Sequence, residues 1–334
     1  MNRRVVLIGA ALLIALAGLG ITVILQSGAP RRHGPLRQEI YVWQRVWTPP
    51  VREAVTHLAT NFDQVVPLKA EISWTDKQPR LVRVALDYPS LANSSQPVGL
   101  ALRVGPYAGP FTTNDSASRF VIETAEALVA EARANSLSPS ELQIDFDCAE
   151  SKLASYRVWV EAIQRRVSPV PVTITALPSW LNAREFKALV RVATNYVLQV
   201  HSVDRPRSVD APFTLCDPLK ARRAVERAGR IGVPFRVAQP TYSYLQAFSH
   251  DGKFLGLSAE GPRPNWPTNA VVREVGANSQ ELAALVFDWT RSRPAALSGI
   301  IWYRLPTSQD RHNWNWEKLR SVMQATNANH GGQR

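Results

Sequence analysis

Two carboxylates close a short predicted strand in the middle of the chain. Asp145 and Asp147 belong to the segment 142–147, which alternates apolar and polar residues and runs directly into a helical pattern. Because side chains alternate along a strand, both carboxylates lie on the same face. A buried carboxylate is costly unless partners or a chemical role hold it there. The pair therefore predicts either acid–base chemistry or a structural charge network.

Asp147 and Glu150 have the spacing of a helix capping box. In that arrangement Asp147 accepts from the backbone N–H of Glu150, and Glu150 reaches back to the cap. The positive end of the following helix would then favour an ionised Asp147. The sequence thus predicts a base, nucleophile or electrostatic role for Asp147 rather than that of the protonated acid, and a cap can also face a cleft.

Glycoside hydrolysis commonly uses two carboxyl groups, one kept protonated and one ionised. Asp147 is the first catalytic candidate. Glu71, near the end of the second predicted strand, is the second, and Asp145 is the third. Asp204, after the sixth strand, is a looser alternative. His201 would either orient a carboxylate or a sugar hydroxyl, or serve as a hydrogen-bonded structural residue.

The elements that must position these residues alternate between strand and helix from residue 38 to residue 328. Strands are predicted at 39–47, 64–72, 98–104, 142–147, 172–176, 196–201, 234–238 and 299–303. Helices are predicted at 51–61, 116–135, 151–167, 182–193, 218–231, 279–291 and 313–326. This order is typical of an α/β fold, the (β/α)₈ TIM barrel. Residues 81–86 have a strand pattern where the second helix should lie, so the second βα unit is expected to be irregular.

Strand alternation predicts an unusually polar barrel lumen. The expected inner face carries Arg45, Lys69, Glu71, Arg103, Asp145, Asp147, Thr175, Gln199, His201 and Arg304. Barrel interiors are usually packed with branched apolar side chains. The polar face therefore predicts a substrate cleft at the carboxyl ends of the strands, or a network deep in the barrel in which Asp145 pairs with Arg103 or Arg45.

Aromatic residues gather at or just after the predicted strand ends. They are Trp43, Trp74, Tyr107, Trp180, Tyr242, Trp302 and Tyr303. Sugar rings pack their apolar faces on aromatic side chains and bond polar groups at their edges. Alternatively, any one of these rings fills a gap between barrel and helices. The predicted sugar-binding set is Trp43, Arg45, Arg103, Tyr107, Thr175, Trp180, Gln199, His201, Tyr242, Trp302 and Arg304.

The segment Ile-Asp-Phe-Asp at 144–147 resembles the fourth strand of chitinase-type glycoside hydrolases. Their signature is D-x-x-D-x-D-x-E, and the final Glu is the general acid. Asp145 and Asp147 match the two inner Asp positions, whereas Leu142 and Ala149 occupy the first Asp and the final Glu positions. Residues 299–302 resemble the last strand of those barrels, where a Trp floors the sugar site.

The pattern from 39 to 325 most closely resembles a bacterial family of domains of unknown function (DUF3142) with a glycoside-hydrolase-like barrel. The segments that carry this resemblance are 144–147, Ile-Thr-Ala-Leu-Pro-Ser-Trp at 174–180 and Gln-Val-His at 199–201. The resemblance implies a carbohydrate polymer as partner but supplies no known activity. Two functions are therefore expected as alternatives. One is a hydrolase acting on an envelope or extracellular polysaccharide, and the other is an inactive barrel that binds glycans.

The amino terminus has the pattern of a membrane segment. Arg3 and Arg4 precede an uncharged, largely apolar run from 5 to 25, about the length that spans a bilayer. We expect a retained signal anchor at 1–25, a linker at 26–37 and the barrel at 38–328. This predicts a single-pass inner-membrane protein with an exported, periplasmic or extracellular body. A cleaved signal peptide is the alternative.

The composition of the chain limits which kinds of binding partner are expected. The 334 residues carry a formal net charge of +12. Much of the excess is scattered arginine, at positions 31, 32 and 37 and then at 222, 223, 227 and 230, and no stretch has the pattern of a dense basic arm. This basic balance indicates a solvated basic surface, for which an anionic lipid or an anionic polymer is a conceivable partner. Nucleic acid is not expected as a partner, because no nucleic-acid-binding motif is present.

No phosphate-loop, dinucleotide or zinc-protease motif occurs, and neither a cofactor nor a metal is expected. Cys148 and Cys216 would either pair in an oxidising compartment or stay as buried thiols. The oligomeric state is left open.

Overall fold

The computed structural model describes residues 29–325, apart from 77, 94, 202–205 and 260–263. The predicted membrane segment at 1–25 and Asp204 lie outside the described residues. Within the described ranges, no helix is both long enough and apolar enough to span a bilayer.

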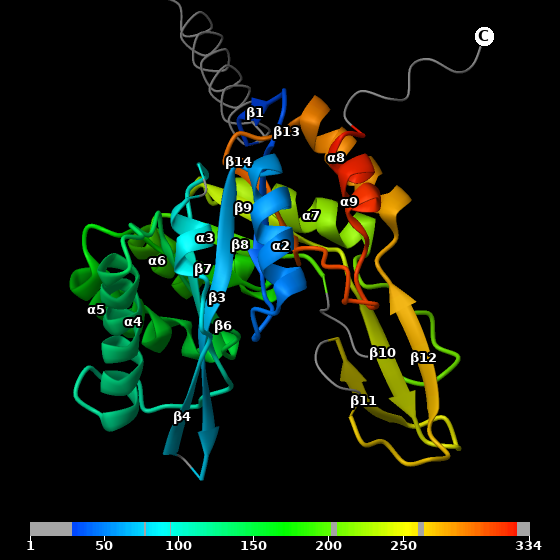
Figure 1. The fold of residues 1–334 in the computed structure, drawn as a ribbon, viewed down its shortest axis with the longest axis horizontal. Coiled ribbons are helices and arrows are strands. Elements are labelled where there is room, and N and C mark those ends of the chain that lie inside the picture. The colour runs from blue at the N-terminus through cyan, green and yellow to red at the C-terminus, as the bar shows by residue number, and fades with distance from the viewer. Residues whose placement is uncertain (1–28, 77, 94, 202–205, 260–263, 326–334) are drawn as a thin grey trace, which may run out of the picture.

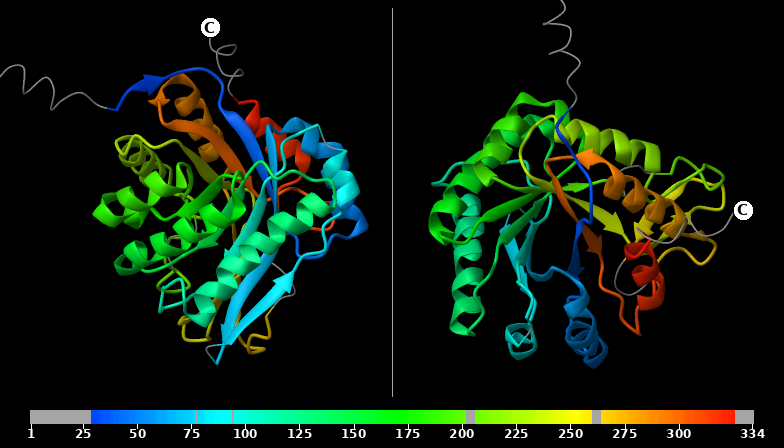
Figure 2. Two further views of the ribbon diagram at one scale, coloured as in Figure 1. Left: turned by 90° about the vertical axis from the view of Figure 1, so that its left-hand side faces the viewer. Right: turned by 90° about the horizontal axis from the view of Figure 1, so that it is seen from above.

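Eight parallel strands close into a barrel, as predicted (Figures 1 and 2). Closure comes from β2, which pairs with β14 on one side and with β3 on the other. The strands are β2 (Arg37–Val42), β3 (Gln64–Thr75), β5 (Leu100–Val104), β6 (Leu142–Phe146), β7 (Val172–Ala176), β8 (Tyr196–Gln199), β9 (Phe235–Pro240) and β14 (Leu297–Tyr303). The TIM-barrel class is therefore confirmed.

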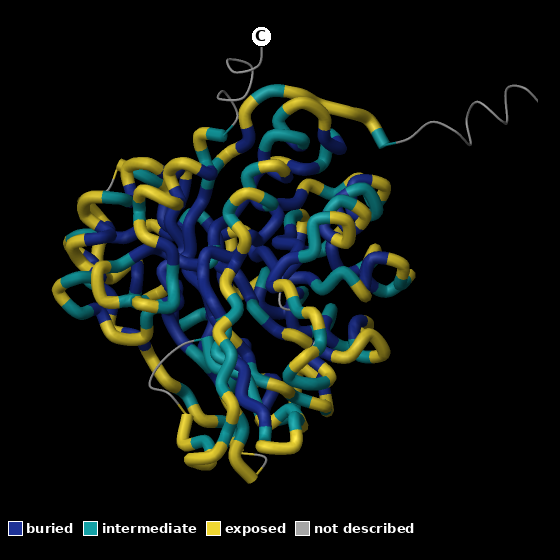
Figure 3. The backbone as a smooth tube through the Cα atoms, turned by 90° about the vertical axis from the view of Figure 1, so that its right-hand side faces the viewer, coloured by how far each residue is buried: buried dark blue, intermediate teal, exposed yellow. Residues whose placement is uncertain are grey.

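Helices surround the barrel and bury one apolar face each. In α6, for example, Phe186, Leu189, Val190 and Ala193 recur at helical spacing and are buried. Figure 3 shows the result, a deeply buried set of strands inside a ring of exposed and half-buried helices. The helices are α2 (Pro49–Leu58), α3 (Tyr88–Ala92), α4 (Ser116–Ala134), α5 (Leu153–Val167), α6 (Arg184–Ala193), α7 (Pro218–Gly229), α8 (Ser279–Arg291) and α9 (Trp316–Met323). The 3₁₀ segments are η1 (Ala59–Asn61), η2 (Glu150–Lys152) and η3 (Pro178–Asn182).

The second βα unit is irregular, as the sequence predicts. β3 extends beyond the barrel and pairs with the antiparallel strand β4 (Gln78–Arg83), and only the short α3 follows. The register of β3 against β5 shifts between Leu68 and Ala70. This bulge turns Lys69 away from the lumen, where it was wrongly predicted, and its Nζ lies 2.6 Å from Glu131 on α4.

A three-stranded antiparallel sheet is inserted after β9. It consists of β10 (Ser243–Phe248), β11 (Phe254–Ser258) and β12 (Val271–Gly276), with β10 in the centre. It lies at the end of the molecule remote from β1 (Figure 1). The sequence indicates only a long excursion here.

At the opposite end of the barrel, a small two-stranded sheet joins two segments that are distant in the sequence. β1 (Arg31–Arg32), within the segment expected to be a linker, pairs with β13 (Arg293–Pro294) just before β14 begins. Arg31 also bonds Glu226 of α7 at 2.6 Å. Gly229 packs so tightly against Pro294 that an added Cβ would come within 2.3 Å of it. These contacts fix the incoming chain to the amino-terminal end of the barrel.

A buried ion cluster fills the amino-terminal part of the lumen. Arg236 of β9 lies 2.5 Å from Glu39 of β2 and 2.7 Å from Glu141, the residue before β6. Burial raises the pKa of Glu141, but the charge of Arg236 and the hydrogen bonds from Arg236, Thr173 and Gln143 together outweigh it and leave that pKa below its usual value. Burial raises the pKa of Glu39, and Arg236 only partly offsets it. The deep charge network is therefore built from residues other than those predicted.

Candidate active site

A pocket of about 570 Å³ opens at the carboxyl ends of the barrel strands. Nine residues of the predicted site line it: Trp43, Arg45, Arg103, Asp145, Asp147, Thr175, Gln199, His201 and Tyr242. They come from five barrel strands or the loops after them and from the start of the insertion. Alternation along the strands brings them together, because residues of one parity reach the lumen where the strands end.

Asp145 is held by donors from the next two strands. It accepts hydrogen bonds from Thr175 Oγ1 at 2.9 Å and from Gln199 Nε2 at 3.1 Å. Arg103 Nε lies 4.0 Å from its second oxygen. A carboxylate that accepts from neutral donors beside a guanidinium is suited to the ionised form.

Asp147 follows β6 and reaches the solvent of the pocket. The pocket walls still exclude much of the surrounding water, and this desolvation is the main cause that raises the pKa of Asp147 to about 7. The neighbouring charge of Asp145 raises it further, and Arg103 lowers it in part. Asp147 is thus poised to carry a proton near neutral pH.

The predicted capping role of Asp147 is wrong. The 3₁₀ segment η2 begins at Glu150 with Ala149 at its N-cap and no side-chain cap, and α5 begins only at Leu153. Asp147 therefore lies outside the first turn, where the helix dipole would have favoured its ionised form. The expectation of an ionised Asp147 rested on that helix start.

Glu71 lies beside the pocket rather than among its lining residues. Its carboxylate receives Arg45 Nε at 2.5 Å and Nη2 at 2.9 Å, and Arg103 Nη1 at 3.4 Å. Arg103 thus lies between Glu71 and Asp145. The two arginine side chains are 40% and 45% exposed. The predicted cluster of Arg45, Arg103 and Asp145 is therefore a feature of the mouth, not of the deep barrel.

Aromatic rings form one wall of the pocket around Tyr303. Its ring centroid lies 5.2 Å from that of Trp43, 5.8 Å from Tyr41 and 5.5 Å from Tyr242. His201 stacks on the same ring at 5.9 Å. Burial lowers the pKa of His201 to about 4, so the ring is neutral at pH 7. Its Nδ1 lies 3.4 Å from the Tyr242 hydroxyl.

Four predicted sugar-binding residues lie elsewhere. Trp302 is fully buried on the outer side of β14 and donates to Gln38 Oε1 at 2.7 Å. Trp180 is buried beside Phe186.

Tyr107 is stacked between Trp74, at 4.4 Å, and Trp159, at 5.5 Å. Arg304 is buried and bonds Asp310 at 2.6 Å. These side chains do not line the pocket.

The remaining lining residues are Tyr41, Leu177, Ala238, Tyr244, Leu257, Ser258, Ala259, Pro264 and Tyr303. Tyr41 shares the strand parity of Trp43, and this signal could have found it. Tyr303 was named among the aromatics, although Trp302 was placed in the site. Tyr244, Leu257 and Ser258 come from the inserted sheet, whose approach to the barrel no local pattern indicates.

Among the residues that the structure describes, no three or more His, Cys, Asp or Glu side chains gather in a way that could hold a metal ion. Cys148 and Cys216 are both buried free thiols. Burial is the main cause that raises the pKa of each thiol to about 12. Neither is therefore poised as a thiolate nucleophile.

Comparison with known proteins gives a family and a fold. The model of the family described as Domain of unknown function (DUF3142) matches residues 105–308. No curated protein sequence matches the chain.

Several solved structures share the barrel at low sequence identity. A chitinase from Chromobacterium violaceum has a TM-score of 0.59 at 13% identity, covering 90% of this chain and 100% of its own. A chitinase from Bacteroides thetaiotaomicron has a TM-score of 0.58 at 13% identity, with the same two coverages. The spore cortex-lytic enzyme SleL from Bacillus megaterium has a TM-score of 0.56 at 13% identity, covering 83% of this chain and 72% of its own.

Proposed function

The chain belongs to the DUF3142 family, and from this membership and its glycoside-hydrolase-like barrel we propose that the protein cleaves a polysaccharide at the pocket around Asp147. The pocket combines two carboxyl groups with an aromatic wall at the carboxyl ends of the strands. This is the part of a TIM barrel that carries catalytic groups. Chitinases and a cortex-lytic enzyme share this fold, which supports a carbohydrate polymer as substrate.

The place of Asp147 beside Asp145 in the pocket at the carboxyl ends of the strands is the observation that carries the proposal, and the raised pKa of Asp147 agrees with it. A carboxylic acid with a pKa near 7 can donate a proton to a glycosidic oxygen at neutral pH. Asp145, held by Thr175 and Gln199, supplies the ionised partner. The division of roles follows from environment, since the pocket walls limit the water around Asp147 and donors surround Asp145. Tyr303, which is half-buried and lines the pocket, offers a face for a sugar ring, and Trp43 packs behind it.

A second function, glycan binding without cleavage, is favoured by Ala149. This residue occupies the position of the general acid in the chitinase-type signature, and its methyl group cannot donate a proton. If Asp147 does not replace that acid, the pocket retains the aromatic wall and polar groups of a sugar-binding site.

Asp147→Asn tests the two functions directly. The variant is expected to lower the cleavage rate by about 10²- to 10⁴-fold, the usual contribution of a positioned acid, while glycan binding is kept. Wild-type activity should fall as the pH rises above about 7, because Asp147 then loses its proton. Reducing-end release from a panel of polysaccharides, measured from pH 5 to 9, is the assay.

Glu150→Gln is the matched control, because this acid is exposed three residues away and does not line the pocket. It should retain the wild-type rate. Cleavage at the wild-type rate by Asp147→Asn would remove Asp147 from the reaction. Binding without cleavage by the wild type across the whole panel would favour the binding function.

The apolar run at 5–25 completes the proposal for the whole protein. We propose that it anchors the chain in the inner membrane, with the barrel exported to meet an envelope or extracellular polysaccharide. Polysaccharide of this kind would be accessible to a pocket outside the membrane.

A further inference from the structure

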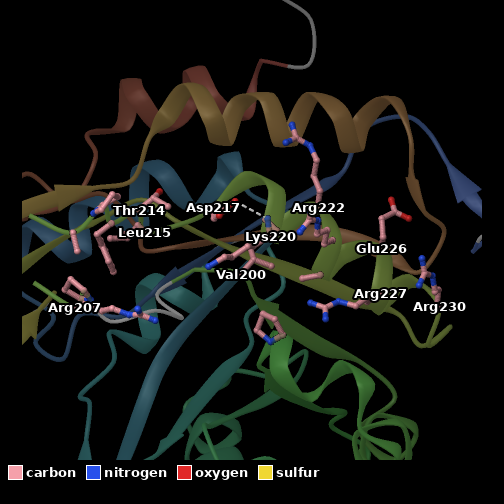
Figure 4. A pocket seen from close by; sticks show the side chains of 18 residues that line it. Val200, Arg207, Thr214, Leu215, Asp217, Lys220, Arg222, Glu226, Arg227 and Arg230 are labelled. Atoms are coloured by element: carbon pink, nitrogen blue, oxygen red, sulfur yellow. Dashed lines mark hydrogen bonds between the residues drawn. The ribbon is translucent and has the colours of Figure 1, made fainter.

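A second and larger groove, of about 1400 Å³, runs along the outside of the barrel beside α7. Its other walls are the loop residues 206, 207 and 211–215, with Pro178 of η3 (Figure 4). Six of its lining residues are cationic: Arg207, Lys220, Arg222, Arg223, Arg227 and Arg230. Only two are acidic, Asp217 and Glu226. The groove is therefore strongly basic.

Both acids of the groove are already engaged. Asp217 caps α7, accepting from the backbone N–H groups of Leu219 and Lys220. Glu226 bonds Arg31 at 2.6 Å. Neither carboxylate therefore neutralises the arginines that face the groove.

Three arginines, two on α7 and one directly after it, face the groove and can contact a ligand. Arg222 is bound to Asp288 at 2.5 Å and is directed toward α8 (Figure 4). Arg223, Arg227 and Arg230 have no ion pair with any acidic residue in the described part of the chain, and they lie on one helix face through their spacing of four and three residues. Nε of Arg227 is also shielded from solvent with no hydrogen-bond acceptor among the described residues.

The arrangement suits a chain of acidic groups rather than one small anion. Arg230, the residue that follows α7, lies seven positions after Arg223, so the three side chains begin at points spread over about 10 Å along the helix axis. Guanidinium groups bind carboxylates through paired hydrogen bonds. A flat bilayer would meet a convex or level surface, whereas this surface is a groove.

The groove also adjoins the proposed active site. Pro178 lines the groove while the preceding Leu177 lines the barrel pocket. Likewise, Val200 lines the groove while Gln199 and His201 line the pocket. The ends of β7 and β8 therefore separate the two cavities by single residues, and one polymer could engage both.

We propose that the α7 groove binds an acidic polysaccharide through Arg223, Arg227 and Arg230. The inference deepens the proposed function, on which it rests, by naming the class of polymer. Acidic groups along the polymer bond the three guanidinium groups, and neighbouring sugar units extend toward the rim of the barrel pocket.

Affinity electrophoresis of the full-length protein in polygalacturonate, with neutral dextran as the comparison polymer, tests the proposal. Wild type should be retarded by polygalacturonate and not by dextran. The combined variant Arg223→Gln, Arg227→Gln and Arg230→Gln should raise the dissociation constant about tenfold or more. It should also weaken the dependence of binding on salt, because three screened charges are removed.

The control variant removes three positive charges elsewhere, through Arg119→Gln, Arg133→Gln and Arg165→Gln. These arginines are exposed on α4 and α5 and do not line the groove. The control should bind as wild type does. An equal loss of affinity in both variants would overturn the proposal, because it would show that net charge alone drives binding. Binding by the α7 variant with the wild-type affinity would also overturn it.

Two further measurements distinguish acidic-polysaccharide binding in the groove from catalysis at the pocket and from membrane binding. Asp147→Asn should bind polygalacturonate as wild type does, so the groove can be tested even if the protein cleaves no polysaccharide. Vesicles containing phosphatidylglycerol, compared with phosphatidylcholine vesicles, test a membrane instead. The proposal would be overturned if wild type preferred the anionic vesicles, if the α7 variant lost that preference, and if polygalacturonate did not retard wild type. Thermal unfolding checks that each variant is folded.

Discussion

Asp145 and Asp147 differ by two positions and share one strand face, yet the structure gives them different surroundings. Asp145 meets a hydroxyl, an amide and a guanidinium. Asp147 meets the charge of Asp145 and a partly dehydrated pocket. Two identical side chains can therefore hold different protonation states, which acid–base catalysis requires.

Asp147 should make stability depend on pH in a particular direction. Its folded-state pKa of about 7 lies above the unfolded value of about 3.9. Between those values the folded chain holds a proton that the unfolded chain lacks, so the free energy of unfolding falls as the pH rises from about 4 to 7. Asp147→Asn should therefore gain stability relative to wild type across that window, as measured by urea unfolding at pH 4, 5.5, 7 and 8.

Ser258→Ala provides the comparison, because Ser258 lines the same pocket and does not titrate. Its difference from wild type should be the same at every pH. A constant difference for Asp147→Asn as well would mean that the carboxyl group is fully hydrated.

Much of the pocket could be predicted at the level of residues, because strand parity decides which side chains enter the lumen. Parity correctly brought Thr175, Gln199 and Asp145 together. It could not give the protonation of Asp147, which depends mainly on how far the pocket walls exclude water and on the charge of Asp145. Parity also did not show which of Trp302 and Tyr303 lines the pocket. Which of two neighbouring side chains points into the lumen at the end of β14 depends on how that strand pairs with its neighbours in the barrel.

At the level of elements, the sequence predicts periodic segments well and their irregularities poorly. The cores of all eight barrel strands were predicted. The bulge at Lys69 was missed because a register shift reflects pairing with a neighbouring strand. The insertion β10–β12 was missed because its strands support one another rather than the barrel, and they have no helical partner to set a pattern.

The Arg236 cluster shows how elements are joined across the lumen. It links β2 and β9 to the start of β6 through groups that are almost fully buried. Arg236→Met should leave Glu39 and Glu141 without their counter-charge and destabilise the fold by about 3–5 kcal/mol. Chemical denaturation at pH 7 measures this loss.

Arg166→Met is the surface counterpart. Arg166 bonds Glu126 at 2.9 Å, but both side chains are largely exposed. Loss of that pair should cost less than about 1 kcal/mol. If the two variants lose the same free energy, the lumen cluster does not hold the strands together.

At the level of the whole molecule, the two ends of the barrel have different tasks. β1 and its partner β13 lie at the amino-terminal end, and the pocket lies at the carboxyl ends of the strands. The overall class could be predicted because eight alternating units permit few architectures. The basic groove could not be predicted, because its net charge depends on the partners of its two acids. Asp217 caps α7 and Glu226 pairs with Arg31, and the sequence does not indicate either contact.

Retention of the amino-terminal run is a prediction for the intact protein. Because the run is long enough to span a bilayer and Arg3 and Arg4 precede it, the mature chain should remain in the membrane fraction with its first residues in place. Cell fractionation followed by amino-terminal sequencing measures this. A soluble periplasmic species that begins near Pro30 or Arg31 would contradict it.

The tie between β1 and β13 sets the direction in which an anchored molecule would face. β1 lies at one end of the barrel (Figure 1), and the pocket lies at the carboxyl ends of the strands, which is the other end. An inner-membrane anchor would therefore hold the catalytic mouth outward, at a barrel's height above the lipid.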